Sequence, residues 1–108
     1  MIVGEITVEN EAVVSLQLSI GTTTVRINAV LDTGFTEYLT LAPDIVSMLS
    51  LPRIESTPML LADGTRVTMD VHETDLLWDG EPRSVPVHVA AGSPLIGMKL
   101  LKGSLVTL

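Results

Sequence analysis

The feature that most constrains the fold of this chain is a hydrophobic period of two. Within residues 12–20, apolar side chains from Val14 to Ile20 occupy every second position and alternate with Ser and Gln, which is the pattern of a strand with one buried face. The alternation recurs over 25–31, after a turn signal at Gly21-Thr22-Thr23. A helix would need apolar spacings of three and four. The two segments therefore predict a β-hairpin, and strands as the main element of the fold.

The rest of the chain continues as short apolar segments separated by turn signals. Asp63-Gly64 and Asp79-Gly80 are each typical of a two-residue hairpin turn. Pro43 suits the first position of a helix. The sequence thus predicts a mostly β fold with about seven to nine strands and one or two short helices. Strands are expected near 5–9, 38–41, 57–78, 85–89, 95–97 and 104–108, and helices near 43–49 and 98–102.

Composition narrows the classes of function. The chain has 108 residues, which suits a single domain over 1–108. Its net charge of −7 argues against nucleic acid and against an anionic membrane surface as partners. Cysteine is absent, which excludes disulfides, thiolate metal sites and a cysteine nucleophile. With 46% hydrophobic residues, the chain has apolar surface to spare, and this indicates association with a partner.

Targeting signals are not evident either. No apolar run approaches the roughly 18 residues that a membrane span needs. The segment 1–11 carries three acidic residues and no basic one, unlike a signal peptide. A cytoplasmic location is the expectation from these two absences.

One short segment carries the chemistry. The apolar run Ala29-Val30-Leu31 leads directly into Asp32-Thr33-Gly34, so Asp32 is expected at the end of a buried strand. A buried carboxylate is costly unless other groups satisfy it. A glycine two residues later lets the backbone fold back and offer N–H donors. An ordinary Asp-containing turn would carry the same triplet, and the segment Leu95-Ile96-Gly97 later in the chain is what favours a functional interpretation.

These motifs resemble those of the retropepsin-like aspartic proteases, single-lobed relatives of pepsin that act as homodimers. The family motif of two hydrophobic residues, Asp, Thr or Ser, and Gly matches 30–34, and the later hydrophobic-hydrophobic-Gly matches 95–97. The hairpin turning at Asp63-Gly64 corresponds to the flap over the cleft. The resemblance runs from about Val14 to Leu108. It implies a closed acid-protease-like β-barrel with one or two short helices and a flap hairpin.

The resemblance also implies a function, which is that of an aspartic endopeptidase. Asp32 of each of two chains would form a catalytic dyad that activates water against a peptide bond, without a metal or other cofactor. Gly34 would support the dyad through its backbone N–H, and Thr33 through a hydrogen bond across the dimer axis. The partners implied are a second copy of the chain and a peptide or protein substrate. The expected cleft and flap residues are Leu31, Phe35, Leu61, Ala62, Asp63, Gly64, Val67 and Ile96, although core packing is the alternative for the apolar ones.

Three departures from the family pattern keep other functions open. The family commonly has Ala or Ser where this chain has Phe35, and many relatives have only glycines where it has Asp63. Met98-Lys99 follows the late glycine where relatives often have a polar or acidic residue. A dimeric protein-binding module that retains the fold without cleaving peptides is therefore the alternative. A small β-barrel with an incidental Asp-Thr-Gly turn is a third interpretation.

The sequence offers little support for other kinds of site, such as a metal site or a serine nucleophile. His72 and Glu73 are adjacent on an extended segment, so their side chains are expected on opposite faces, where they cannot easily share one metal ion. His88 stands alone between two valines and is expected at the surface. The sequence contains neither a glycine-rich phosphate loop nor a serine nucleophile elbow.

Overall fold

The computed structural model describes the backbone of residues 1–108 and every side chain except that of Met59. The chain forms ten strands and two short helices, so the prediction of a mostly β fold is confirmed. The described helices are too short to cross a bilayer. The elements are β1 (Ile2–Val3), β2 (Glu5–Ile6), β3 (Ala12–Ile20), β4 (Thr23–Leu31), β5 (Leu39–Leu41), α1 (Pro43–Met48), β6 (Arg53–Leu60), β7 (Arg66–Trp78), β8 (Glu81–Val89), β9 (Leu95–Ile96), α2 (Met98–Leu101) and β10 (Val106–Thr107).

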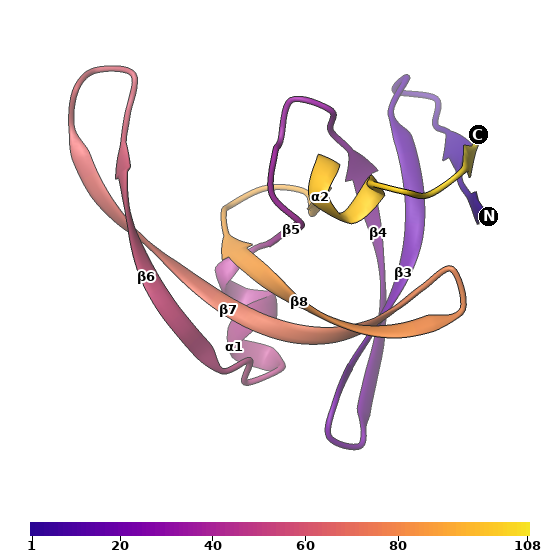
Figure 1. The fold of residues 1–108 in the computed structure, drawn as a ribbon, viewed down its shortest axis with the longest axis horizontal. Coiled ribbons are helices and arrows are strands. Elements are labelled where there is room, and N and C mark those ends of the chain that lie inside the picture. Colours follow the sequence, from indigo (N-terminus) through magenta and orange to yellow (C-terminus); the bar gives the residue numbers. More distant parts are fainter.

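Six of the strands close into a barrel. Their order is β3-β4-β9-β5-β8-β7, and a second pairing of β3 with β7 closes the circle (Figure 1). The closing register joins Leu18 to Leu76 in the antiparallel direction. β9 lies between β4, to which it is parallel, and β5, to which it is antiparallel. The expectation of a closed β-barrel is therefore confirmed.

The barrel interior holds the core, and the period of two explains why. Along β3, Val14, Leu16 and Leu18 are buried, whereas the intervening side chains are exposed or half-buried. Leu39 and Leu41 of β5 are completely buried. Such alternation places one face of each strand in the barrel and the other toward solvent. The core also contains Leu76, Trp78, Val85, Val87, Ile96 and Leu100.

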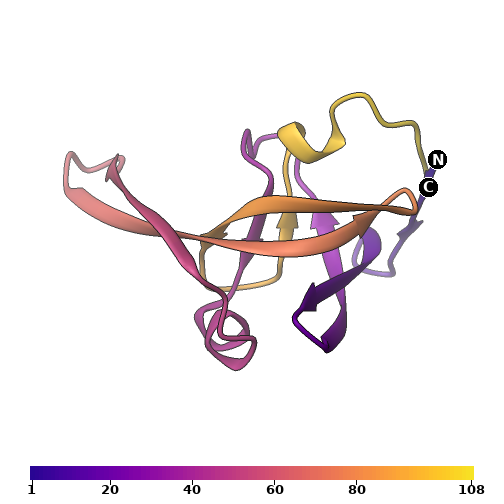
Figure 2. The ribbon, with the colours of Figure 1, turned by 60° about the horizontal axis from the view of Figure 1, so that its bottom comes forward.

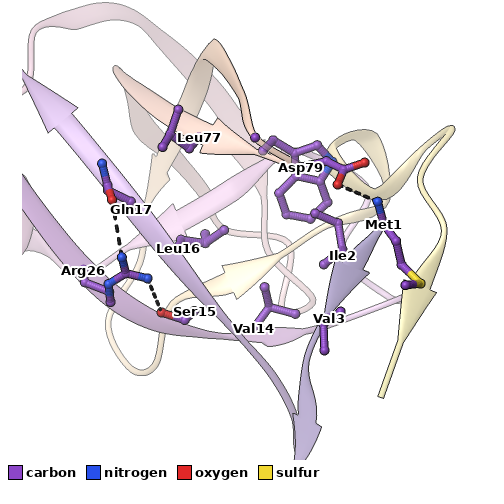
Figure 3. A pocket seen from close by; sticks show the side chains of 12 residues that line it. Met1, Ile2, Val3, Val14, Ser15, Leu16, Gln17, Arg26, Leu77 and Asp79 are labelled. Atoms are coloured by element: carbon purple, nitrogen blue, oxygen red, sulfur yellow. Dashed lines mark hydrogen bonds and ion pairs between the residues drawn. The ribbon is translucent and has the colours of Figure 1, made fainter.

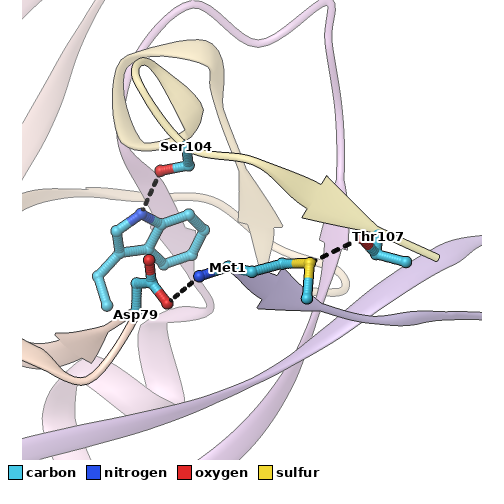
Figure 4. A network of polar contacts seen from close by, with 5 residues as sticks. Met1, Asp79, Ser104 and Thr107 are labelled. Carbon is cyan, nitrogen blue, oxygen red and sulfur yellow. Dashed lines mark hydrogen bonds and ion pairs between the residues drawn. The ribbon is translucent and has the colours of Figure 1, made fainter.

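The chain ends lie side by side and are tied to the barrel. β1 pairs with β10 in the parallel direction, apart from the main sheet, and both views place the two termini together (Figures 1 and 2). The Trp78 indole N–H donates to the Ser104 hydroxyl at 2.8 Å, and the N-terminal amine of Met1 pairs with Asp79 at 2.5 Å (Figure 4). These contacts fix the terminal sheet against the β7–β8 turn.

The β6–β7 hairpin projects from the barrel (Figures 1 and 2). Only the part of β7 from Val71 onward pairs with β8, so residues 66–70 have β6 as their sole neighbour. In both views its tip and the loop between β4 and β5 lie toward the same side of the molecule.

The φ angles and strand pairing confirm the predicted two-residue turn at Asp79-Gly80, but they show that the loop at Asp63-Gly64 has three residues. Asp79 and Gly80 form a two-residue turn between paired Trp78 and Glu81, with φ of 54° and 80°, as a type I′ turn requires. At the tip of β6–β7 the loop has three residues, because the Leu61 N–H donates to the Thr65 carbonyl at 2.8 Å.

Candidate active site

The two motifs that carry the resemblance are hydrogen-bonded neighbours. β4 and β9 run in parallel, with Leu31 beside Ile96. The Asp32 N–H then donates to the Ile96 carbonyl at 3.0 Å, and the Val30 N–H donates to the Pro94 carbonyl at 2.8 Å. Asp32 is thus fixed at the end of a barrel strand by backbone bonds to a segment that lies more than sixty residues later.

The Asp32 carboxylate is held by its own loop. Its Oδ1 accepts a hydrogen bond from the Gly34 N–H at 2.9 Å, and its carbonyl accepts one from the Phe35 N–H at 3.1 Å. The Asp32 side chain is half-buried, whereas Thr33 and Gly34 are exposed. A carboxylate held by a backbone donor and still open to solvent is suited to exchange a proton with a bound water molecule.

Helix α2 anchors the loop from the other side. The Met98 N–H donates to the Phe35 carbonyl at 2.8 Å, and the Gly97 N–H donates to the Tyr38 carbonyl at 3.0 Å. The Lys99 ammonium group donates to both carboxylate oxygens of Glu37, at 3.1 and 3.0 Å. The residues after the late glycine, which depart from the family pattern, therefore still hold the Asp32 loop.

A pocket of about 480 Å³ adjoins this loop. One wall is the loop itself, with Gly34 and Phe35. His88, which was expected at the surface, lines the pocket instead, and its ring meets that of Phe35 edge to face at 6.1 Å between centroids. His88 is half-buried rather than exposed, because Phe35 and the other residues that line the pocket surround its ring. The remaining lining residues are Thr36, Glu37, Thr40, Thr57, Met69 and Ala90.

Several of these lining residues were missed from the sequence. Thr57 and Met69 are cross-strand partners in the β6–β7 hairpin, and Val71 and His88 are partners between β7 and β8. Because alternate residues of a strand share a face, Met69 and Val71 lie on one face of β7. The register of the predicted hairpin could have identified Thr57 and Met69, whereas Thr40 and Ala90 come from contacts remote in sequence.

The predicted cleft residues of the barrel separate into two groups. Gly34 and Phe35 line the pocket. Leu31 is half-buried and packs against the core. Ile96 is completely buried in the core, so the expectation that its side chain lines the cleft was wrong. The reason is that its side chain packs in the core cluster with residues such as Leu39 and Leu100.

The predicted flap residues lie at the tip of β6–β7, away from the pocket wall of this chain. Ala62, Asp63 and Gly64 form the exposed loop, and Gly64 has a φ of 85°, as the last residue of a three-residue hairpin loop requires. Leu61 and Val67, at 42% and 39% exposure, present apolar surface beside that loop.

Asp63 stabilises this tip. Its Oδ1 accepts a hydrogen bond from the Thr65 N–H at 2.9 Å. Hydrogen bonds from the backbone and then from the side chain of Thr65 lower the pKa of Asp63 below its ordinary value of 3.8. The charged side chain is therefore part of the turn.

A second, smaller pocket of about 240 Å³ lies beside the terminal strands (Figure 3). Met1, Val14 and Leu77 contribute to its walls, and the guanidinium group of Arg26 donates to Ser15 and Gln17 at 3.4 Å each. Its lining includes no residue of the loop 32–38, so it is separate from Asp32. Among the described residues, no three His, Asp or Glu side chains are grouped to hold a metal ion.

Comparison with known proteins identifies the fold. No protein-family model and no curated protein matches the sequence. The EIAV protease, solved in complex with the inhibitor HBY-793, superimposes with a TM-score of 0.67 and 18% identity over 94% of this chain and 97% of its own. The Simian foamy virus (mac) protease gives a TM-score of 0.62 and 17% identity over 86% of this chain and 99% of its own. The chain has the retropepsin-like fold of these viral proteases.

Proposed function

We propose that this chain is an aspartic endopeptidase, active as a homodimer in which each subunit contributes Asp32. The observation that carries the proposal is the setting of that carboxylate. It is half-buried, bonded to the Gly34 N–H, fixed at the end of β4 and adjacent to a pocket of about 480 Å³. A retropepsin-like fold supplies the frame, and both similar structures are named as proteases.

A second copy of the chain is needed because one Asp-Thr-Gly segment supplies one carboxylate. The terminal sheet supports association, since it presents apolar side chains to solvent. Val3, Leu105 and Leu108 are 65%, 69% and 56% exposed. An exposed apolar patch and open strand edges are features that a symmetric partner can cover.

The chemistry follows from two carboxylates held within about 3 Å, as is known for aspartic protease dyads. Two negative charges so close are unfavourable, so the pair retains one proton. The ionised Asp32 accepts a proton from a water molecule while the water oxygen bonds to the peptide carbonyl carbon. The protonated Asp32 of the other subunit donates to the carbonyl oxygen. Transfer of a proton to the amide nitrogen then releases the amine, and the carbonyl of the new acid re-forms.

Neighbouring residues support this step. Gly34 fixes Asp32 through its N–H, and Thr33, which is exposed, would bond across the dimer axis. The substrate lies extended between the loop and the β6–β7 hairpin, so that alternate side chains enter pockets. Leu31, Phe35, Leu61 and Val67, with the tip residues 62–64, form the walls and cover of that cleft in the dimer.

The test is peptide cleavage at mildly acidic pH by the wild type and by Asp32→Asn. The carboxamide keeps an oxygen that accepts the Gly34 N–H, so the variant is expected to fold normally and to lose cleavage almost completely. Asp44→Asn, which changes an exposed aspartate on α1, is the matched control and is expected to retain activity. Equal cleavage by Asp32→Asn and the wild type would remove Asp32 from the mechanism. Peptide binding without cleavage by the wild type would favour a binding module instead.

A further inference from the structure

We infer that strand β10 joins the two subunits, by pairing in the antiparallel direction with β10 of a second copy about a twofold axis at Val106. The strands then lie in the order β1-β10-β10′-β1′, where primes mark the partner, and each chain keeps its own β1. The inference rests on the proposed function, because it describes the partner that completes the Asp32 site. It depends on a free strand edge, on the uncharged apolar surface beside that edge and on the position of the termini.

The outer edge of β10 has unpaired backbone groups. β10 pairs with β1 and with no other described strand, and the far side of β1 faces β3 across the smaller pocket, which residues of both strands line (Figure 3). The Ile2 N–H donates to the Leu105 carbonyl at 2.8 Å, and the Gly4 N–H donates to the Thr107 carbonyl at the same distance. Because successive residues of a strand direct their backbone groups to opposite edges, the N–H and carbonyl of Val106 point away from β1. Such an edge can pair with another strand.

Twofold symmetry selects Val106 as the centre of the new pair. Two residues directly opposite each other in an antiparallel pair can exchange both of their N–H···O bonds, and Val106 directs both groups to the free edge. A centre at Leu105 would need the Ser104 N–H, which already donates to the Leu101 carbonyl at 2.9 Å. A centre at Thr107 would leave Leu105 beyond the paired segment. A centre at Val106 places Leu105 opposite Thr107 of the partner subunit and covers it.

The side chains beside this edge suit a second copy of the chain. Val3 and Leu105 are 65% and 69% exposed on the outward face of the terminal sheet, whereas Ile2 and Val106 pack against the core. Residues 103–108 carry no charged side chain. Copies of a chain with a net charge of −7 repel one another most where carboxylates meet, so an uncharged edge is favourable for their association.

The termini lie on the side of the molecule that carries Asp32. In both views they lie toward the same side as the loop between β4 and β5, which begins with Asp32, and helix α1 lies toward the opposite side (Figures 1 and 2). A partner that pairs with β10 can therefore face the Asp32 loop as well. Since each chain supplies one Asp32 carboxylate, the proposed site is incomplete until such a partner is present.

Disulfide cross-linking tests the register, and the chain has no cysteine of its own. Leu105→Cys and Thr107→Cys change exposed side chains, so both variants are expected to fold. They are mixed in equal amounts, one with a size tag, and oxidised. In the proposed register the Cα atoms of Leu105 and the partner's Thr107 are about 4.5 Å apart, whereas those of Leu105 in the two chains are about 7–8 Å apart. We therefore expect at least about tenfold more linked heterodimer than either linked homodimer, because the longer separation exceeds the disulfide range.

Met48→Cys is the control for chance collisions, since Met48 is 62% exposed on α1. A heterodimer yield no higher than the yield of linked Met48→Cys chains overturns the inference. Preferential linking of Leu105→Cys or of Thr107→Cys to itself also overturns it, because the axis would then pass through another residue.

A second pair of cysteines tests whether each chain keeps its own β1. Val3 lies beside Thr107 in the parallel register, so Val3→Cys combined with Thr107→Cys in one chain is expected to form a disulfide within that chain. Dimers linked through this pair would show instead that β1 pairs with β10 of the partner. That result would overturn the proposed strand order.

Cleavage measured on the same samples separates this inference from the proposed function. The linked heterodimer should keep its activity on dilution to a concentration at which the wild type dissociates and loses activity. Peptide cleavage by the wild type without preferential linking of the heterodimer overturns the strand pairing and leaves the protease proposal intact. A preferentially linked heterodimer that cleaves no peptide supports the pairing and contradicts the protease proposal.

Discussion

Gly97 lies so close to the backbone of Glu37 that a Cβ atom at position 97 would be 2.1 Å from the Glu37 carbonyl oxygen and 2.8 Å from that of Phe35. This approach packs α2 against the Asp32 loop, and it explains in physical terms why the late motif ends in glycine. Because both obstacles are backbone atoms, neither can rotate away.

Gly97→Ala is therefore expected to lower the free energy of unfolding by about 3 kcal/mol, at the upper end of overpacking costs. Urea denaturation followed by circular dichroism measures this change. Gly34→Ala is the comparison, since its Cβ would meet the rotatable Asp32 carboxylate at 3.2 Å, and a loss of under about 1 kcal/mol is expected. Equal stability of Gly97→Ala and the wild type would contradict the packing described for α2.

The turn of the β6–β7 hairpin is expected to respond to acid through Asp63. Hydrogen bonds from Thr65 hold the pKa of Asp63 below its ordinary value of 3.8, so ionised Asp63 stabilises the folded turn. That contribution is fully present above 3.8 and disappears as the pH falls through the lowered pKa. A carboxyl NMR titration should give a midpoint below 3.8, and the Thr65 amide shift should follow it. Asp63→Ala should remove the titration from Thr65, and a wild-type midpoint above the ordinary value would refute the assignment.

The ion pair between Lys99 and Glu37 is expected to contribute little to stability. The two side chains are 52% and 35% exposed, at an N–O distance of 3.0 Å, and pairs open to solvent are screened. Lys99→Met should lower the free energy of unfolding by about 0.5 kcal/mol at low salt. The loss should be smaller in 1 M NaCl, because salt at that concentration shortens the Debye length to ~3 Å and screens the pair. Arg53→Met, which removes a longer and more exposed pair with Asp70 at 3.7 Å, should have a smaller effect. A loss above about 2 kcal/mol for Lys99→Met would indicate a structural role beyond this ion pair.

Association is expected to depend on the terminal sheet. Leu105 is 69% exposed beside β10, so Leu105→Asp would place a charge in the proposed subunit interface. Sedimentation equilibrium should show at least a tenfold weaker dimer, since an unpaired interfacial charge costs more than about 1.4 kcal/mol. Met48→Asp changes a side chain of similar exposure, 62%, on α1, and should leave the dimer intact. Equal weakening by both variants would argue against an interface at the termini.

The sequence predicts well those elements that depend only on residues close together in the chain. The alternation in 12–20 and 25–31 identifies β3 and β4 because burial of one face depends on neighbouring residues alone. Asp79-Gly80 predicts its turn because a type I′ turn requires only that its two central residues adopt positive φ angles, which Asp and Gly favour. Helix α1 begins at Pro43 as expected and ends at Met48, within one residue of the expected end, and Ser50 behind it adopts a φ of 51° that the helix cannot continue.

What the sequence does not predict depends on contacts between distant strands. The motif 95–97 does not show that β9 pairs with both β4 and β5, so the sequence alone does not decide between the core and the cleft for Ile96, which the structure buries in the core. The position of His88 in the pocket requires knowing that β5 pairs with β8 in parallel. At the tip of the β6–β7 hairpin, the dipeptide Asp63-Gly64 fits loops of two or three residues, and the pairing of Leu61 with Thr65 decides between them.

The most direct test of the account is a crystal structure of the protein in its solution oligomer, with the separation of the two Asp32 carboxylates as the measured quantity. We expect a symmetric dimer with these groups about 3 Å apart, sharing a water molecule beneath the two hairpins. Carboxylates farther apart than about 10 Å in every assembly, or a chain that stays monomeric at high concentration, would contradict it.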